Sequence, residues 1–263
     1  MKNEEEFYIG YYPKAPKGIA KANKIAVAVV AAILLLTAFI ISRSEKKLPA
    51  SQFEYGTLTE LEGILYSQPV PLLRVQTGKD ANGQAVYKSV LLVNFLKHGA
   101  APLLKAYQKK GFVEAQSLVK LRGTLIYHDG VTLMELTEQE NALLSVKENQ
   151  NPAPVLQRDS LGEVILKGEI VDSKCYFGVM KPGEGKPHRD CAIRCISGGI
   201  PPVLVVKNEQ GEAQYMLLVG QNGEPINQQV LTFVGLPIRL KGKLEKLGDW
   251  YVLRINANDI VLS

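Results

Sequence analysis

Three cysteines and one histidine form the most distinctive chemical pattern in this 263-residue chain. All the cysteines of the protein lie within 21 positions, from Cys175 to Cys195, and His188 lies between them. The order is Cys175, twelve residues, His188, two residues, Cys191, three residues and Cys195. Thiolate and imidazole groups are the ligands that zinc, copper(I) and iron–sulfur centres prefer. The pattern therefore predicts a local site at which these four side chains act together.

A helix over residues 188–196 would place three of these side chains on one face. Steps of three and four residues follow helical periodicity, and at about 100° per residue His188, Cys191 and Cys195 fall within a sector of about 60°. Pro187 would lie in the first turn, where the amide hydrogen that proline lacks has no partner. Cys175 would come from the end of the preceding strand and be returned to the helix by a Pro-Gly loop.

Three kinds of chemistry fit this pattern. The first is a metal site with zinc, copper or iron bound by Cys175, His188, Cys191 and Cys195. The second is a disulfide from Cys175 to either Cys191 or Cys195, which an oxidising compartment would allow. The third is catalysis by a cysteine nucleophile with His188 as its base, but the sequence identifies no oxyanion hole and only nearby acids such as Asp172 as orienting groups. The pattern leaves the metal and the disulfide open and does not favour an enzyme.

The other two histidines lie outside this pattern. Neither His98 nor His128 has a cysteine or carboxylate pattern around it, so we expect ordinary surface or turn histidines at both positions. His128 precedes Asp129-Gly130, a sequence typical of a two-residue hairpin turn. The predicted site is therefore confined to residues 172–202.

Residues 25–42 form an apolar segment without a charged side chain. Its length lies near the low end of the ~17–25 residues that span a bilayer. A cleaved signal peptide would have a shorter apolar region of about 7–15 residues followed by a small-residue cleavage site. Because the sequence ISRSEKK closes this segment instead, we predict an N-terminal tail at residues 1–24 and an uncleaved single-pass anchor at residues 25–42.

The positive charge of the chain is concentrated around this segment. The net charge is +5, and residues 1–47 contribute +4 of it through eight Lys or Arg against four Glu. A basic flank of this kind favours a membrane surface and gives little support to nucleic-acid binding. The distribution of lysines slightly favours an N-terminus inside the cell, which would place the C-terminal domains in an extracytoplasmic or periplasmic compartment.

The rest of the chain is predicted to be mainly β. Residues 53–147 contain short β-branched or alternating runs separated by Gly, Pro and Asn/Asp signals, with helical spacing only between the third and fourth runs. Residues 148–158 are polar and contain proline, as a linker does. Five strands with one helix between the third and fourth are the layout of a small Greek-key barrel of the OB type.

Residues 159–263 repeat the pattern of the first β domain. Gly123 matches Gly242 and Gly63 matches Gly168, so the two halves are predicted to be tandem OB-like barrels. Where the second half carries the Cys/His segment, the first half has only SQPVP, at residues 67–71. Since the fold does not need the longer segment, we interpret it as a functional insert.

The insert resembles a motif of poorly characterised, membrane-anchored bacterial proteins. The residues that carry the resemblance are VDSKCYFGVMKPGEGKPHRDCAIRCISGGIPP, which follow the form D-x-x-C…H-x-x-C-A-x-x-C…G-G-x-P over about thirty positions. The C-terminal region of those proteins looks like a small OB-type barrel. The resemblance implies that Cys175, His188, Cys191 and Cys195 occupy the motif positions, and it implies no reaction and no cofactor.

These observations predict a membrane-anchored, extracytoplasmic accessory protein. Its Cys/His site would be metal-binding or redox-associated, and it would serve a membrane protein complex. The alternative from a different class is a structural or interaction module that a disulfide staples, and a thiol-redox enzyme is third. None of these three interpretations includes a nucleic-acid partner.

Overall fold

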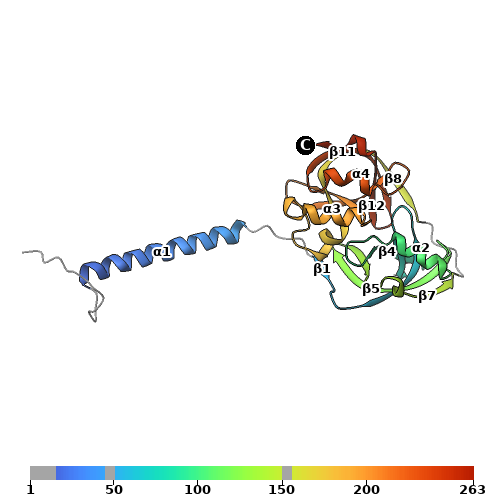
Figure 1. The fold of residues 1–263 in the computed structure, drawn as a ribbon, viewed down its shortest axis with the longest axis horizontal. Helices are drawn as coiled ribbons and strands as arrows, with labels where there is room; N and C mark the ends of the chain where they lie inside the picture. Colours follow the sequence, from blue (N-terminus) through green and yellow to red (C-terminus); the bar gives the residue numbers. More distant parts are fainter. Residues whose placement is uncertain (1–15, 45–50, 150–155) are drawn as a thin grey trace, which may run out of the picture. The chain divides into compact units, whose positions relative to one another are not determined.

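The computed structural model describes residues 16–44, 51–149 and 156–263, and every structural statement below concerns these residues. Contacts divide the chain into two units, residues 1–48 and residues 49–263. In the first unit, α1 (Lys17–Ser44) contains a candidate span of 27 residues, in which an 18-residue window has a mean hydropathy of 2.9, and it is long and apolar enough to cross a membrane (Figure 1). The helix begins before residue 25, so part of the predicted tail is helical, while residues 1–15 lie outside the described part.

The first sheet of the second unit closes on itself. Strand β5 pairs with β2 on one side and with β6 on the other, so that β2, β3, β4, β6 and β5 form a five-stranded barrel. The pairing of β4 with β6 is parallel and the other pairings in this barrel are antiparallel. The helix α2 (Ala101–Lys109) connects β4 to β5. The strands are β1 (Ser51–Phe53), β2 (Thr59–Tyr66), β3 (Leu72–Lys79), β4 (Ala85–Asn94), β5 (Ser117–His128), β6 (Val131–Leu136) and β7 (Leu143–Glu148).

The second sheet follows the same order of pairing. Strand β8 pairs with β9 and β11, β10 pairs with β9 and, in parallel, with β12, and β12 also pairs with β11. Its connections carry α3 (Arg189–Ser197), between β8 and β9, and the short α4 (Asn227–Val230), between β10 and β11. The strands are β8 (Arg158–Asp172), β9 (Pro202–Lys207), β10 (Ala213–Gly220), β11 (Pro237–Leu247), β12 (Trp250–Ile255) and β13 (Val261–Leu262).

Glycines lie at equivalent positions in the two sheets, where paired strands approach each other closely. A Cβ atom at Gly63 of β2 would lie 2.5 Å from a carbonyl oxygen of β3, and one at Gly168 of β8 would lie 2.3 Å from a carbonyl oxygen of β9. A Cβ atom at Gly123 of β5 would meet a β6 carbonyl oxygen at 2.3 Å, and one at Gly242 of β11 would meet a β12 carbonyl oxygen at 2.7 Å. Each glycine therefore lets two strands approach more closely than any side chain would allow.

The apolar core has three parts, and one of them joins the two sheets. One cluster lies in the first barrel under α2, and another lies in the second sheet under α3 and α4. The third contains residues of both sheets, such as Leu91 and Trp250, and in addition Tyr176 and Phe177 of the insert. The insert is thus packed between the two sheets rather than projecting from them (Figure 1).

Candidate metal centre

The insert folds into two short helical segments that face each other. Strand β8 ends at Asp172, a π-helical turn follows at Cys175–Val179 (η2), and a 3-10 turn at Lys186–His188 (η3) leads into α3. The Asp172 carboxylate accepts a hydrogen bond from the Cys175 amide at 2.8 Å and so fixes the start of the first segment. The helix predicted at residues 188–196 is confirmed, because α3 runs from Arg189 to Ser197 with His188 directly before it.

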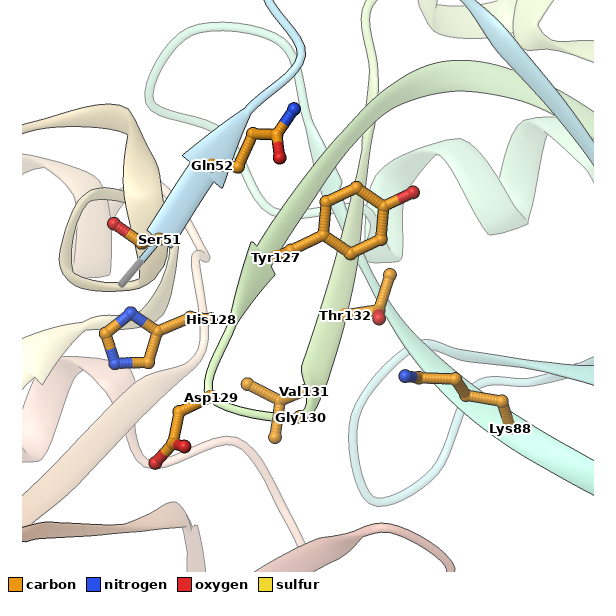
Figure 2. Close-up of a pocket in the computed structure, with 9 residues that line it drawn as sticks. All are labelled: Ser51, Gln52, Lys88, Tyr127, His128, Asp129, Gly130, Val131 and Thr132. Atoms are coloured by element: carbon orange, nitrogen blue, oxygen red, sulfur yellow. The ribbon is translucent and has the colours of Figure 1, made fainter. Parts of the chain in front are cut away.

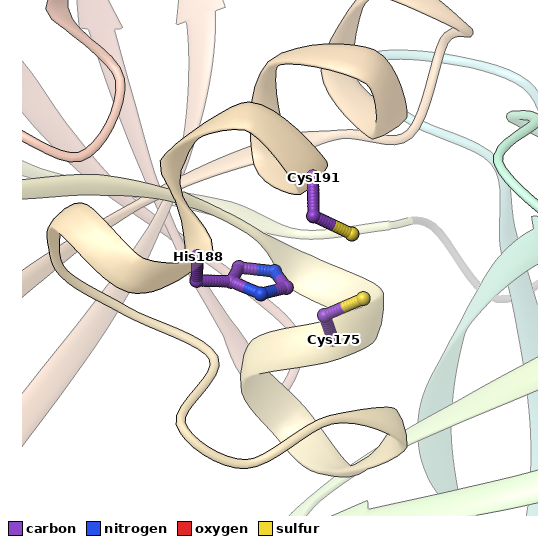
Figure 3. Close-up of side chains that lie close together, drawn as sticks. All are labelled: Cys175, His188 and Cys191. Carbon is purple, nitrogen blue, oxygen red and sulfur yellow. The ribbon is translucent and has the colours of Figure 1, made fainter.

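The structure brings the predicted ligands together. The ligand atoms of Cys175, His188 and Cys191 all lie within 4.8 Å of one another, and Figure 3 shows the three side chains pointing toward a common centre. A second group within the same limit consists of Asp172, Cys175 and Cys195. These Cys, His and Asp groups could therefore hold a metal ion. The donor set of thiolates and imidazole fits a tetrahedral centre.

The candidate ligands differ in their access to solvent. Cys175, His188 and Cys195 are at most 5% exposed, whereas Cys191 is only partly buried. The site therefore opens to solvent on the side of Cys191. Water is excluded from the other sides by the aromatic and aliphatic side chains of the shared core.

Asp172 orients the histidine of the site. Its Oδ2 atom lies 2.9 Å from Nε2 of His188, and both side chains are almost fully buried. A carboxylate can only accept, so Nε2 is the donor of this hydrogen bond and Nδ1 is the nitrogen left to bind a metal. This carboxylate–histidine arrangement is the one that fixes the tautomer of metal-binding histidines. With Oδ1 bonded to the Cys175 amide, Asp172 acts behind the ligands rather than as one of them.

A hydrogen bond links two of the thiols, those of Cys175 and Cys195. The Cys175 thiol donates to Cys195, which lowers the pKa of Cys195, and the positive charge of Lys97 acts in the same direction. The same hydrogen bond, together with burial, raises the pKa of Cys175 far above its ordinary value. Of these two thiols, Cys195, on the α3 side near Lys97, is therefore the one that ionises more readily.

Lys97 is a residue of the site that the sequence did not indicate. It lies in the loop between β4 and α2, and its Nζ is 2.9 Å from Sγ of Cys191 and 3.9 Å from Sγ of Cys195. The hydrogen bond to Cys191 raises the pKa of Lys97. Because 94 positions separate Lys97 from Cys191, no local motif could connect them.

The lysine is held there by a contact between two backbones. The Gly99 amide donates to the Gly198 carbonyl at 2.9 Å. A Cβ atom at Gly99 would lie 2.0 Å from the Gly199 carbonyl oxygen, and one at Gly198 would lie 1.9 Å from the carbonyl oxygen of Lys97. The Gly-Gly pair that ends α3 therefore has a role beyond stopping the helix: it lets the first sheet approach the site.

A buried ion pair anchors the insert to the first sheet. Nζ of Lys174 lies 2.9 Å from Oε1 of Glu135 in β6, and both side chains are nearly inaccessible. The ammonium also donates to the carbonyls of Asn94 and Leu96, at 3.1 and 2.7 Å. These three acceptors satisfy all the donors of Lys174, so this cation is structural and is not available to the site.

The disulfide that was predicted as an alternative is not formed. All three cysteines of the chain lie in the described part, and all are free thiols. Cys175 and Cys191 converge on a centre shared with His188, and Cys175 is joined to Cys195 by a hydrogen bond, not by the S–S contact of about 2.05 Å that a disulfide needs. The prediction of a staple is therefore wrong for this structure.

His128 is also not the ordinary surface or turn residue that was predicted. Its side chain is buried against Tyr176, Phe177 and Tyr215, with ring centroids 5.2–5.5 Å away. Desolvation lowers the pKa of His128 to about 4, with the charge of Lys181 acting in the same direction and Asp129 opposing it. The packing of the insert against the first sheet, which no local pattern encodes, buries this ring.

A separate surface pocket lies beside the hairpin that joins β5 and β6. Its volume is about 340 Å³, and its lining includes Gln52, Lys88 and Tyr127 (Figure 2). No cysteine lines it, so it does not belong to the Cys/His site.

No family model matches the chain, and no curated protein matches it. The resemblance of the insert to a bacterial motif therefore stays a prediction. The function has to be argued from the geometry of the site.

Proposed function

We propose that the insert binds one metal ion through Cys175, His188, Cys191 and Cys195, with Asp172 behind the histidine. The observation that carries this proposal is the convergence of free thiols and an oriented imidazole within 4.8 Å in a largely buried place. Without a metal, the three thiols would be buried polar groups whose hydrogen-bonding capacity is only partly satisfied. Such burial costs free energy. A bound ion removes that cost and ties η2 to α3, so the proposed role of the metal is to hold the insert together.

Charge balance favours a divalent ion, and we propose zinc. With all ligands deprotonated, the site and its neighbours Asp172 and Lys97 carry three net negative charges. A divalent ion leaves one of them uncompensated, whereas copper(I) leaves two. Buried charge without compensation is costly, and four closed ligands of this type suit structural zinc. Copper and iron are the other ions compatible with the donor set.

We also propose that the two sheets are tandem copies of one OB-like barrel. Support comes from the identical order of pairing, with one parallel pair in each, and from the glycines at equivalent crossings. In this interpretation the insert replaces the short connection at residues 67–71 of the first copy, between the first and second strands.

At the level of the cell, we propose a membrane-anchored accessory protein that serves a membrane complex. The long apolar helix near the N-terminus supports the anchor. The lysines that precede the apolar segment at residues 25–42 slightly favour an extracytoplasmic or periplasmic location for the β domains.

One alternative has an observation in its favour. The Cys175 thiol is hydrogen-bonded to Cys195, whose pKa is lowered, and such a pair could exchange electrons with a partner disulfide. The step would be attack of the Cys195 thiolate on the partner disulfide, release of the partner thiolate and closure by Cys175, leaving the partner reduced.

Metal analysis of the full-length protein, purified in detergent under reducing conditions without added metal, tests the proposal. We expect about one zinc per chain, and three thiols that an alkylating reagent reaches only after chelation. His188→Ala should retain much less zinc, while His98→Ala, at an exposed position, should retain the wild-type amount. Wild-type protein that is folded and metal-free, or a His188→Ala variant with full zinc content, would contradict the proposal. Metal-free protein with a reversible Cys175–Cys195 disulfide would support the alternative.

A further inference from the structure

The solvent side of the Cys/His site is covered by one cation from the other sheet. Cys191 is the candidate ligand that is partly exposed, and the Lys97 ammonium donates to its sulfur at 2.9 Å. The same ammonium lies 3.9 Å from Cys195, so it stands over the two sulfurs that α3 contributes. A ligand from outside that approaches a metal in this site from the open side meets Lys97 first.

The backbone around Lys97 is fixed, so only the side chain is free to move aside. The amide of Asn94 donates to the His98 carbonyl at 2.9 Å and closes the loop. The next residue, Gly99, is locked against the end of α3 by its bond to the Gly198 carbonyl and by the absence of room for a side chain on either glycine. The loop thus fixes the backbone from which the lysine side chain reaches Cys191.

The buried ammonium of Lys174 cannot take the place of Lys97 at the sulfurs. Lys174 has its three donors satisfied by Glu135 and by two backbone carbonyls. The two lysines therefore have different roles. Lys174, a residue of the insert, anchors the insert to the first sheet, and Lys97, a residue of the first sheet, contacts the sulfurs.

We propose that Lys97 gates exchange of the bound metal, with Cys191 as the ligand that detaches first; this inference rests on the proposed metal site. A metal-bound thiolate that accepts a hydrogen bond from an ammonium keeps its negative charge compensated. The hydrogen bonds of the ammonium to the two sulfurs also hold the lysine side chain over the open side of the site. An incoming thiol or chelator has to break these bonds before it reaches the ion, so the lysine slows release of the metal.

Zinc release to a neutral chelator measures the gate without a contribution from attraction between the chelator and the lysine. The full-length protein is loaded with zinc in detergent and mixed with excess N,N,N′,N′-tetrakis(2-pyridylmethyl)ethylenediamine. Zinc that stays on the protein is measured after rapid desalting. We expect Lys97→Met, which keeps the length and removes the charge, to release zinc at least tenfold faster than wild type. Lys97→Arg should stay within about threefold of wild type. The control Lys105→Met, at an exposed position of α2, should not differ.

The outcomes separate this inference from the proposed function. If wild type and Lys97→Met both hold one zinc and release it at equal rates, the gate is overturned and the metal site stands. If Lys97→Arg releases zinc as fast as Lys97→Met, charge is not the cause and the gate is overturned. If wild type holds no zinc, the metal site itself fails and the gate fails with it.

Discussion

Asp172 makes contact with two of the groups that define the Cys/His site. It accepts from the Cys175 amide with one oxygen and from the His188 ring with the other. A single carboxylate therefore sets both the start of η2 and the tautomer of the imidazole. Sequence inspection finds this acid near the cysteines, but only the fold shows that both of its oxygens are used.

Replacing Asp172 by Asn should weaken zinc binding about 10- to 100-fold, the cost usual for a group that orients a metal ligand. The amide can still accept from one donor, so the protein should remain folded. Competition titration against a chelator of known affinity measures the change. Asp190→Asn, which changes an exposed acid in the first turn of α3, should bind zinc as wild type does; equal losses in the two variants would show that Asp172 has no special role.

His128 should make the protein less stable in mild acid. Its folded-state pKa of about 4 lies below the ordinary value of 6.5, so between these values the unfolded chain binds a proton that the folded protein does not. The stabilisation is present above pH 6.5 and is lost as the pH falls toward 4. Because water screens part of this effect, we expect about 1 kcal/mol less unfolding free energy at pH 5 than at pH 7 from this residue.

Denaturant unfolding in detergent, followed by the fluorescence of the single tryptophan, Trp250, measures this loss. His128→Phe keeps a ring in the cluster with Tyr176, Phe177 and Tyr215 and removes the titrating group. The variant should lose less stability than wild type between pH 7 and pH 5. Parallel losses in the two proteins would mean that other groups cause the acid sensitivity.

At the scale of elements, the contact between the β4–α2 loop and the end of α3 decides whether Lys97 reaches the sulfurs. Gly99→Ala would place a Cβ atom 2.0 Å from the Gly199 carbonyl oxygen, so the loop must move. We expect a loss of about 1–3 kcal/mol in unfolding free energy, the usual cost of overpacking. Zinc release should be accelerated as in Lys97→Met. Gly78→Ala, in open space on β3, is the matched control and should change neither quantity.

The elements were predictable to different degrees. The five strand runs of the first domain and the helix of the insert follow from local alternation and spacing, and they are confirmed by β2–β6 and α3. The approach of His188 and Cys191 was also predictable, because helical spacing puts them on one face, and the return of Cys175 by the Pro-Gly loop completes their group. Three features were not predictable from the sequence, because each depends on how the first sheet packs on the insert. They are the contact of Lys97 with the sulfurs, the burial of His128 and the Lys174–Glu135 pair.

At the scale of the whole molecule, the buried Lys174–Glu135 pair joins the insert to the first sheet. Glu135→Gln would remove the negative charge that compensates the buried ammonium of Lys174. We expect a loss of about 3 kcal/mol in unfolding free energy, at the lower end for a broken buried pair. Glu60→Gln, in a pair with Lys120 whose side chains are 40% and 41% exposed, should cost less than about 1 kcal/mol. Similar losses at the two sites, measured by denaturant unfolding, would contradict this role.

The proposed metal site, the insert and the contact between the two sheets depend on one another. The insert occupies the core cluster that both sheets share, and its two halves meet at the Cys/His site. A metal that holds η2 against α3 would thereby also stabilise the joint between the sheets. Removal of zinc should therefore lower the unfolding free energy of the whole 49–263 unit rather than release the insert alone.

X-ray absorption at the zinc edge of the full-length protein tests the central claim most directly, because it reports the atoms bound to the ion. The account predicts three sulfurs at about 2.3 Å and one nitrogen at about 2.0 Å from zinc. In His188→Ala, the nitrogen should be lost or replaced by oxygen while the sulfur shell remains. A zinc shell made only of oxygen and nitrogen in the wild-type protein would contradict the account.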